Sequence, residues 1–201
     1  MVNRNHNLDR KDKYYSRAKK ENYRSRASYK LLEIQSKFGI IKSGDYVLEF
    51  GSSPGGWTQV VQEFTDKPVI SVDITRMEPI ENVLFIHGDI NDPELTSKIK
   101  DVMISTGIKY MGSILSDAMV KTSGNYDRDH YGSFLLCENV MKRSLSLLAK
   151  GGNAVLKQFQ GDSTNLFVNT WKKYFNFYKV TKPNASRQHS REVYIVFKGK
   201  V

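Results

Sequence analysis

The chain is poor in the residues that form cross-links or bind metals. Its 201 residues include one cysteine, Cys137, and a single cysteine excludes an internal disulfide. The spacing of the four histidines matches no metal-binding motif, so we expect no metal site. These histidines are His6, His87, His130 and His189.

Long apolar runs are also missing. No stretch approaches the roughly 20 apolar residues that a membrane-spanning helix needs. Residues 1–20 are polar and charged, which is unlike a secretory signal peptide. We therefore expect a cytoplasmic protein that does not bind membranes. A hydrophobic content of 39% and this length fit one folded domain.

Acidic residues are outnumbered, and the imbalance is local. Residues 1–30 contain ten Lys or Arg and three Asp or Glu, and so contribute +7 of the net charge of +10. Residues 1–21 lack apolar periodicity, which predicts a flexible basic arm ahead of a domain spanning 22–201. Clustered cations favour a nucleic-acid partner through counterion release. A solvated tail that only aids solubility is the alternative.

The rest of the chain alternates short apolar strands with helices, which predicts a mostly parallel α/β sheet covered on both faces. The connection 183–192 is too short for a crossover helix, so the last two strands should pair antiparallel. A seven-stranded sheet of this kind is the methyltransferase variant of the Rossmann-like fold. We expect strands at 46–50, 69–73, 83–87, 110–115, 154–158, 177–182 and 193–198, and helices at 22–38, 57–64, 93–105, 127–148 and 164–175.

A glycine-rich turn separates the first strand from its helix, as in nucleotide-binding elements. The turn reads G-S-S-P-G-G rather than G-x-G-x-x-G, and it follows Glu49 without a Lys or Arg to neutralise phosphate. A ligand with positive charge suits this site, and S-adenosylmethionine carries both an ammonium and a sulfonium. The candidate cofactor-binding residues here are Glu49, Gly51, Ser53, Pro54, Gly55, Gly56 and Trp57.

Two more acids follow the next two strands. Asp73 lies 22 residues after Gly51, where an acidic side chain in such folds accepts hydrogen bonds from ribose hydroxyls. Asp89 is placed to accept from the adenine amine, although a turn or helix-capping role explains it equally well. We include Ile74 and Ile90, which follow these acids, in the predicted cofactor site.

Lys157 lies in an apolar strand, where a buried ammonium is costly unless it is paired. Asp117, after the fourth strand, and Glu192, at the entry to the last strand, are its candidate partners. Such a pair either holds strands together or serves catalysis. With Lys30 in the first predicted helix, these residues form the candidate catalytic group.

Five motifs occur in an order and spacing that resemble the FtsJ/RrmJ family, the heat-shock ribosomal RNA 2′-O-methyltransferases. The resemblance runs from about residue 12 to the carboxyl end. It implies a catalytic Lys-Asp-Lys-Glu tetrad at Lys30, Asp117, Lys157 and Glu192, and cofactor contacts at Gly55, Trp57, Asp73, Asp89 and Asp117. The motifs are Arg24-Ser25-Arg26-Ala27 through Lys30-Leu31, Gly51 through Trp57, Ser116-Asp117, Lys157 through Gly161, and Ser190 through Tyr194.

One motif departs from the family. Members commonly continue Ser-Asp with Met-Ala-Pro-Asn, whereas this chain continues Ser116-Asp117 with Ala118-Met119-Val120-Lys121. The acid is kept, but the shape of this loop and its substrate contacts should differ.

The resemblance implies S-adenosylmethionine-dependent 2′-O-ribose methylation of RNA, with a uridine of large-subunit ribosomal RNA as the target. We expect a monomer that acts on the large ribosomal subunit and not on DNA. A tRNA 2′-O-methyltransferase, a non-catalytic ribosome-assembly factor and a small-molecule or protein methyltransferase are the alternatives. Lys157 would either orient the hydroxyl or act as its base. The expected RNA track comprises Lys11, Lys13, Arg17, Lys19, Lys20, Arg24 and Arg26, with Tyr14, Tyr15 and Tyr23, extended by Lys179, Lys182, Arg187 and Arg191.

Overall fold

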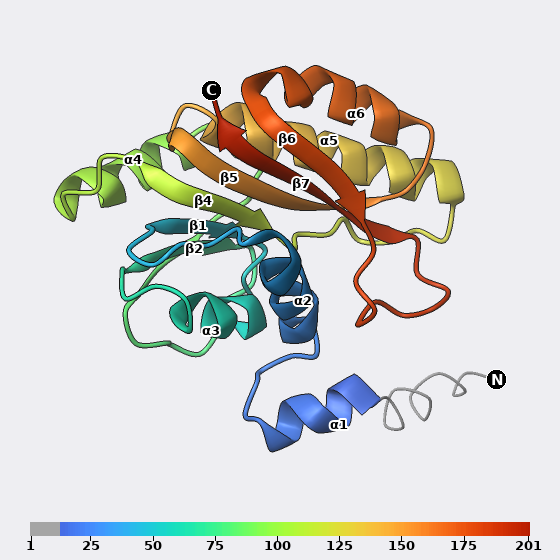
Figure 1. The fold of residues 1–201 in the computed structure, drawn as a ribbon, viewed down its shortest axis with the longest axis horizontal. Coiled ribbons are helices and arrows are strands. Elements are labelled where there is room, and N and C mark those ends of the chain that lie inside the picture. Colours follow the sequence, from blue (N-terminus) through green and yellow to red (C-terminus); the bar gives the residue numbers. More distant parts are fainter. Residues whose placement is uncertain (1–12) are drawn as a thin grey trace.

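The computed structural model describes residues 13–201, which form a seven-stranded sheet with the order β3-β2-β1-β4-β5-β7-β6 (Figure 1). Strands β1 to β5 are mutually parallel, whereas β7 pairs antiparallel with both β5 and β6. The predicted fold class is confirmed, with β7 as the one reversed strand. The strands are β1 (Val47–Phe50), β2 (Val69–Asp73), β3 (Val83–His87), β4 (Met111–Ser116), β5 (Leu148–Phe159), β6 (Phe175–Thr181) and β7 (Glu192–Lys200).

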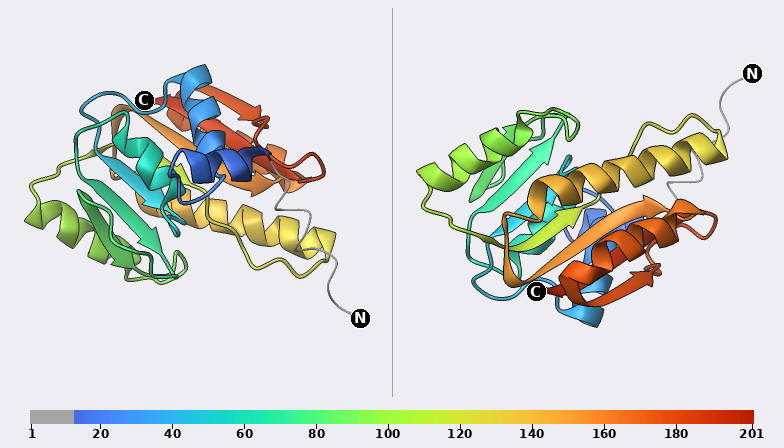
Figure 2. Two further views of the ribbon diagram at one scale, coloured as in Figure 1. Left: turned by 90° about the horizontal axis from the view of Figure 1, so that it is seen from below. Right: turned by 90° about the horizontal axis from the view of Figure 1, so that it is seen from above.

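Helices cover both faces of this sheet (Figures 1 and 2). On one face lie α2 (Ser28–Phe38) and α3 (Gly56–Gln62). On the other lie α4 (Leu95–Ser105), α5 (Tyr126–Ser144) and α6 (Ser163–Trp171), followed by the short 3₁₀ helix η2 (Lys172–Tyr174). Within residues 13–201, no helix is both long and apolar enough to cross a membrane.

The central strands are apolar on both sides because each side packs against helices. Ile114 of β4 and Leu156 of β5 belong to the core on the side of α5 and α6. Their neighbours Leu115 and Val155 point the other way, into the core beneath α2 and α3. Lys157 follows these apolar residues in β5 and is also buried. The sheet therefore places a charged side chain next to its apolar core.

The expected flexible arm differs from the structure. Residues 1–12 of this arm lie outside the described part of the chain. Lys13–Lys20 forms helix α1, so the prediction that this segment lacks regular structure is wrong. Ala18 is buried against Tyr29 and Ala185, and Glu21 accepts hydrogen bonds from Arg17 and from the Tyr29 hydroxyl. The helix thus contacts the domain through one small apolar residue and contains one i,i+4 ion pair. These features produce almost no apolar periodicity, so the sequence gives little indication of the helix.

Several helix boundaries also differ from prediction. The helix expected at 22–38 begins at Ser28, and the one expected at 127–148 ends at Ser144. Gly152, expected to end that helix, lies inside β5 instead. A side chain at Gly152 would lie 2.9 Å from the Gly112 carbonyl oxygen, so a glycine lets the strands approach.

The turn after β1 depends on Gly51, and this dependence is testable. Gly51 has φ +75°, and a Cβ there would lie 2.5 Å from the Ala118 backbone. We expect Gly51→Ala to lower the free energy of unfolding by about 3 kcal/mol, because left-handed strain and overpacking add. Gly124 has φ +84° but open space around it, so Gly124→Ala should cost only about 1 kcal/mol. Urea denaturation measures both, and equal losses would contradict this explanation.

Candidate active site

A buried ion pair lies where β4 and β5 meet at their carboxyl ends. The Lys157 ammonium is 3.0 Å from Asp117 Oδ1, and the Lys157 side chain is only 7% exposed. The same oxygen accepts a 2.8 Å hydrogen bond from the Tyr194 hydroxyl. Lys157 and Tyr194 are directly paired across β5 and β7, so the register of these strands brings both to one carboxylate. Of the two predicted partners of Lys157, Asp117 is the one in direct contact.

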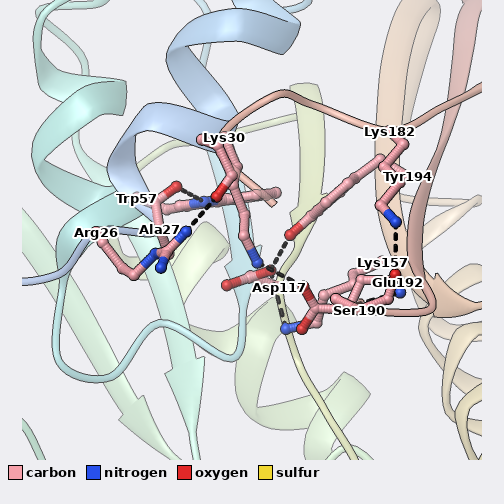
Figure 3. Close-up of polar contacts among 11 residues, drawn as sticks. Arg26, Ala27, Lys30, Trp57, Asp117, Lys157, Lys182, Ser190, Glu192 and Tyr194 are labelled. Atoms are coloured by element: carbon pink, nitrogen blue, oxygen red, sulfur yellow. Dashed lines mark hydrogen bonds and ion pairs between the residues drawn. The ribbon is translucent and has the colours of Figure 1, made fainter. Parts of the chain in front are cut away.

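A second ion pair lies beside the first. Lys30 of α2 is 2.7 Å from Glu192 at the start of β7. Burial alone would raise the pKa of Glu192, but the ammonium groups of Lys30 and Lys157 outweigh it, and the pKa is lowered. Both acids therefore meet lysines in one small region, and the four predicted tetrad residues converge there (Figure 3). The prediction that these four side chains meet agrees with this geometry.

Tyr194 links the two pairs, and no role was predicted for it from the sequence. Lys30 lies 5.7 Å from the centre of the Tyr194 ring, whose hydroxyl binds Asp117. Burial, followed by the negative charges of Asp117 and Glu192, raises the pKa of this phenol well above its usual value, so it stays a donor. Side chains alternate between the two faces of a strand, so Glu192 and Tyr194 lie on the same face of β7. This spacing could have identified Tyr194 as a residue of the site.

A cavity of about 440 Å³ opens at the carboxyl ends of the parallel strands, and its lining includes Ala118, the residue after Asp117. Asp73 ties this wall to the glycine-rich turn by accepting hydrogen bonds from the Ser53 and Thr75 amides at 2.9 and 2.7 Å. Five predicted cofactor residues line the cavity, together with Ala118 and Met119 from the loop that departs from the family motif. These five are Gly51, Asp73, Ile74, Asp89 and Ile90.

Asp89 has the turn geometry that was the alternative explanation for it. Its Oδ1 accepts from the Asn91 amide at 2.8 Å and from the Asn91 side chain at 3.0 Å. A carboxylate has four acceptor positions, so these two bonds leave room for a ligand amine. The two interpretations of Asp89 are therefore compatible.

Glu49 is the most unusual acid of the site. It is fully buried at the end of β1, and its Oε2 accepts a 2.6 Å hydrogen bond from the Thr58 hydroxyl. Its other oxygen has no hydrogen-bond partner within residues 13–201. Burial, with smaller effects from Asp117 and Asp73, raises the pKa of Glu49 to about 8. Glu49 is not among the residues that line the cavity. A buried acid oxygen without a partner is costly, and a cationic ligand group is one partner that would satisfy it.

The glycines that end the turn lie in a crowded region, and the positive φ of Gly55 favours glycine there. Gly55 has φ +108°, and a Cβ there would lie 2.6 Å from the Ile80 side chain, whereas one at Gly56 would overlap Ser25. Arg24 closes this contact by donating to the carbonyls of Pro54, Glu78 and Pro79. Arg24, expected on the RNA track, therefore holds the glycine-rich turn.

Trp57 also differs from the simplest expectation. Its ring is 3% exposed and packs against Tyr194 with centres 5.7 Å apart, and its N–H donates to the Ala27 carbonyl. Trp57 lies outside the residues that line the cavity, and it packs against Tyr194, which binds Asp117 of the tetrad. Within residues 13–201, no three His, Cys, Asp or Glu side chains are grouped to hold a metal ion.

A single reversed strand at one side of a parallel sheet, with a ligand cavity at the ends of β1, β2 and β3, defines a Rossmann-like methyltransferase. A family model described as FtsJ-like methyltransferase matches residues 23–200. The chain belongs to this family, and the predicted family is confirmed.

Named relatives agree with this membership. "Ribosomal RNA large subunit methyltransferase E" of Picrophilus torridus is 57% identical over 96% of this chain and 100% of its own length. The protein of the same name from Thermoplasma acidophilum is 46% identical over 95% and 93%. A Plasmodium falciparum crystal structure described as a ribosomal RNA methyltransferase is 32% identical, with a TM-score of 0.78, and the match covers 89% and 98% of the two chains. The predicted enzyme class, an RNA methyltransferase, is confirmed.

The raised pKa of Glu49 makes stability depend on pH. In the unfolded chain this carboxyl ionises near the ordinary glutamate pKa of 4.5, whereas in the folded protein it stays protonated up to about pH 8. Its stabilising contribution is therefore complete below pH 4.5 and is lost as the pH rises to about 8. As the pH rises from 5 to 8, the free energy of unfolding of Glu49→Gln should increase by about 3 kcal/mol relative to that of the parent, because the amide does not titrate. Urea midpoints at both pH values measure this, and parallel pH profiles would contradict it.

Proposed function

We propose that the methyl donor is S-adenosylmethionine, held in the cavity at the carboxyl ends of the parallel strands. The unsatisfied oxygen of Glu49 would accept from the cofactor's ammonium. Asp73 and Asp89 in the cavity wall would accept from the ribose hydroxyls and the adenine amine. When bound, the cofactor supplies an electrophilic methyl group on a positively charged sulfur. Asp73 and Asp89, together with Glu49 once it has released its proton, are complementary in charge to a cationic ligand.

We further propose that the acceptor is the 2′-hydroxyl of a ribose in RNA. The single observation that carries this assignment is the pairing of Lys157 with Asp117, 3.0 Å apart and buried next to the cavity that contains Ala118. A hydroxyl is a weak acid that must be oriented and relieved of its proton during displacement. Held by Asp117, the Lys157 ammonium can donate to the hydroxyl oxygen and stabilise its developing charge while the hydroxyl proton passes to water. A neutral Lys157 would instead accept that proton itself and become the ammonium that Asp117 holds.

Lys30 and Glu192 complete this arrangement as a second ion pair beside the first. The Lys30 ammonium, fixed by Glu192, adds a second positive charge for the ribose or its adjacent phosphate. Tyr194 keeps Asp117 oriented, because its phenol stays protonated. Each charge in the tetrad thus has a partner before the substrate arrives, which limits reorganisation during the reaction.

Large-subunit ribosomal RNA is the substrate that the relatives' names favour, and a uridine is our proposed target nucleotide. Helix α1 supports an RNA partner, because it carries Lys13, Arg17, Lys19 and Lys20 without an acidic residue in its own span. Clustered cations of this kind bind RNA phosphates, while Tyr15 is exposed for base stacking. A monomer that works in the cytoplasm, where it meets large ribosomal subunits, completes the proposal.

Transfer from labelled S-adenosylmethionine tests the proposal directly. Large ribosomal subunits, free ribosomal RNA and tRNA should be offered in parallel, and the labelled nucleotide identified. We expect label in a uridine of large-subunit RNA. Label only in tRNA would keep the enzyme class and overturn the substrate, and cofactor binding without any transfer would point to a non-catalytic assembly factor.

Lys157 should carry much of the rate. Lys157→Ala should lower turnover by about 10²-fold, the usual scale for losing an electrostatic or acid–base group. The dissociation constant for S-adenosylmethionine should stay within about twofold, because Glu49, Asp73 and Asp89 remain. Lys100→Ala, at an exposed position of α4, is the matched control and should keep full activity. Near-parental turnover of Lys157→Ala in a single-turnover assay would overturn the assignment.

Cofactor binding should release a proton at neutral pH. Glu49, with a pKa of about 8, is mostly protonated at pH 7, and a cationic ammonium beside it favours the ionised form. A plot of the binding enthalpy at pH 7 against the ionisation enthalpy of the buffer should therefore have a slope that corresponds to the release of almost one proton. Glu49→Gln should bind more weakly and show no such change. Calorimetry in phosphate and Tris measures this, and buffer-independent heat for the parent would exclude the contact.

A further inference from the structure

A second cavity, of about 490 Å³, opens between the start of α2 and the connection from β6 to β7. Arg26 and Lys30 form its wall on the α2 side, and Arg187 and His189 form the wall on the other side. Lys30 and Glu192, which form an ion pair, both line this cavity, so it borders the tetrad. Its volume lies within the usual range of small-ligand sites.

The outer wall is a connection of ten residues, 182–191, without helix or strand. Helix α2 holds the beginning of this connection through Glu33. One Glu33 oxygen accepts from the Asn184 amide at 2.6 Å, and the other accepts from the Ala185 amide at 2.9 Å. Arg26 donates to the Ala185 carbonyl, and Ala185 is fully buried. The carboxylate therefore fixes the backbone at the point where the connection leaves β6.

Lys182 holds the other end of the same connection (Figure 3). Its ammonium donates to the Ser190 carbonyl at 2.6 Å and to the Gln188 carbonyl at 3.3 Å. The Ser190 hydroxyl in turn accepts from the Glu192 amide. Lys182, expected on the RNA track, thus closes the connection into a loop just before the tetrad acid.

We propose that this cavity binds the RNA nucleotide adjacent to the target ribose, and that Glu33 and Lys182 are positioning residues that hold its outer wall. The inference rests on the proposed function and names a further part of its RNA site. Lys30 and Glu33 are three residues apart in α2 and so lie on one side of the helix. One helix therefore presents Lys30 to the reacting ribose and sets the position of the wall.

The chemistry of the lining selects a phosphodiester-linked nucleotide. Among the residues that line the cavity, Arg26, Lys30 and Arg187 carry positive charge and Glu192 carries the one negative charge, and Lys30 is paired with Glu192. A net positive lining favours phosphate, and arginine forks suit its oxygens. The exposed imidazole of His189 offers a flat surface for the adjoining base.

Steady-state kinetics of Glu33→Gln and Lys182→Met test the proposal with an RNA that the parent methylates. Gln offers one acceptor where two backbone amides need two, and Met keeps the length of Lys182 without its donors. The KM for RNA should rise about tenfold, while kcat and cofactor affinity stay within about twofold. Lys182→Arg should restore most of the KM, because it returns a cationic donor. Asp101→Asn and Lys100→Met, exposed on α4, are the matched controls.

An unchanged KM in both variants, or a fall in kcat with KM unchanged, would overturn the proposal. Hydrogen exchange at the Asn184 and Ala185 amides tests the positioning itself without catalysis. These two amides should exchange faster in Glu33→Gln while the sheet core keeps its protection, and parental rates would overturn the positioning role. Failure of the parent protein to methylate any RNA would contradict the proposed function instead, and the exchange experiment would still decide the role of Glu33.

Discussion

A lysine ammonium buried between two strands needs a carboxylate within reach, and the contact of Lys157 with Asp117 meets that need. Removing either partner would leave a buried charge uncompensated, at a cost of about 3–5 kcal/mol. The strand order satisfies this constraint because β5 lies between β4, which delivers Asp117, and β7, which delivers Tyr194 and Glu192. The tetrad thus follows from strand pairing more than from any single loop.

The acids at this edge of the sheet have two kinds of electrostatic environment. Asp117 and Glu192 are paired with lysines, whereas Glu49 has an oxygen without a partner and a pKa raised to about 8. Paired acids hold cations in place for the acceptor, and the unsatisfied acid is suited to a cation that arrives with the methyl donor. Donor and acceptor therefore meet between carboxylates with different electrostatic environments.

Much of this arrangement could be predicted from sequence, because strand alternation, the short connection 183–192 and the cost of a lysine in an apolar strand are local signals. The insertion of β7 between β5 and β6 could not, since pairing partners depend on tertiary packing. For the same reason, Arg24 and Lys182 looked like surface cations, although backbone carbonyls far along the chain or across a loop bind them. A Lys or Arg in a polar segment of the sequence therefore does not identify an RNA contact when its side chain can instead bind the carbonyls of a nearby loop.

The central claim is that the Lys157 and Asp117 pair serves a ribose hydroxyl. Alkaline hydrolysis of RNA labelled by this enzyme tests it most directly. Cleavage requires attack by a free 2′-oxygen on the adjoining phosphodiester, so a 2′-O-methyl group protects that linkage. We expect the label to be recovered in an alkali-resistant dinucleotide. Recovery in ordinary mononucleotides would place the methyl group on a base and contradict the claim.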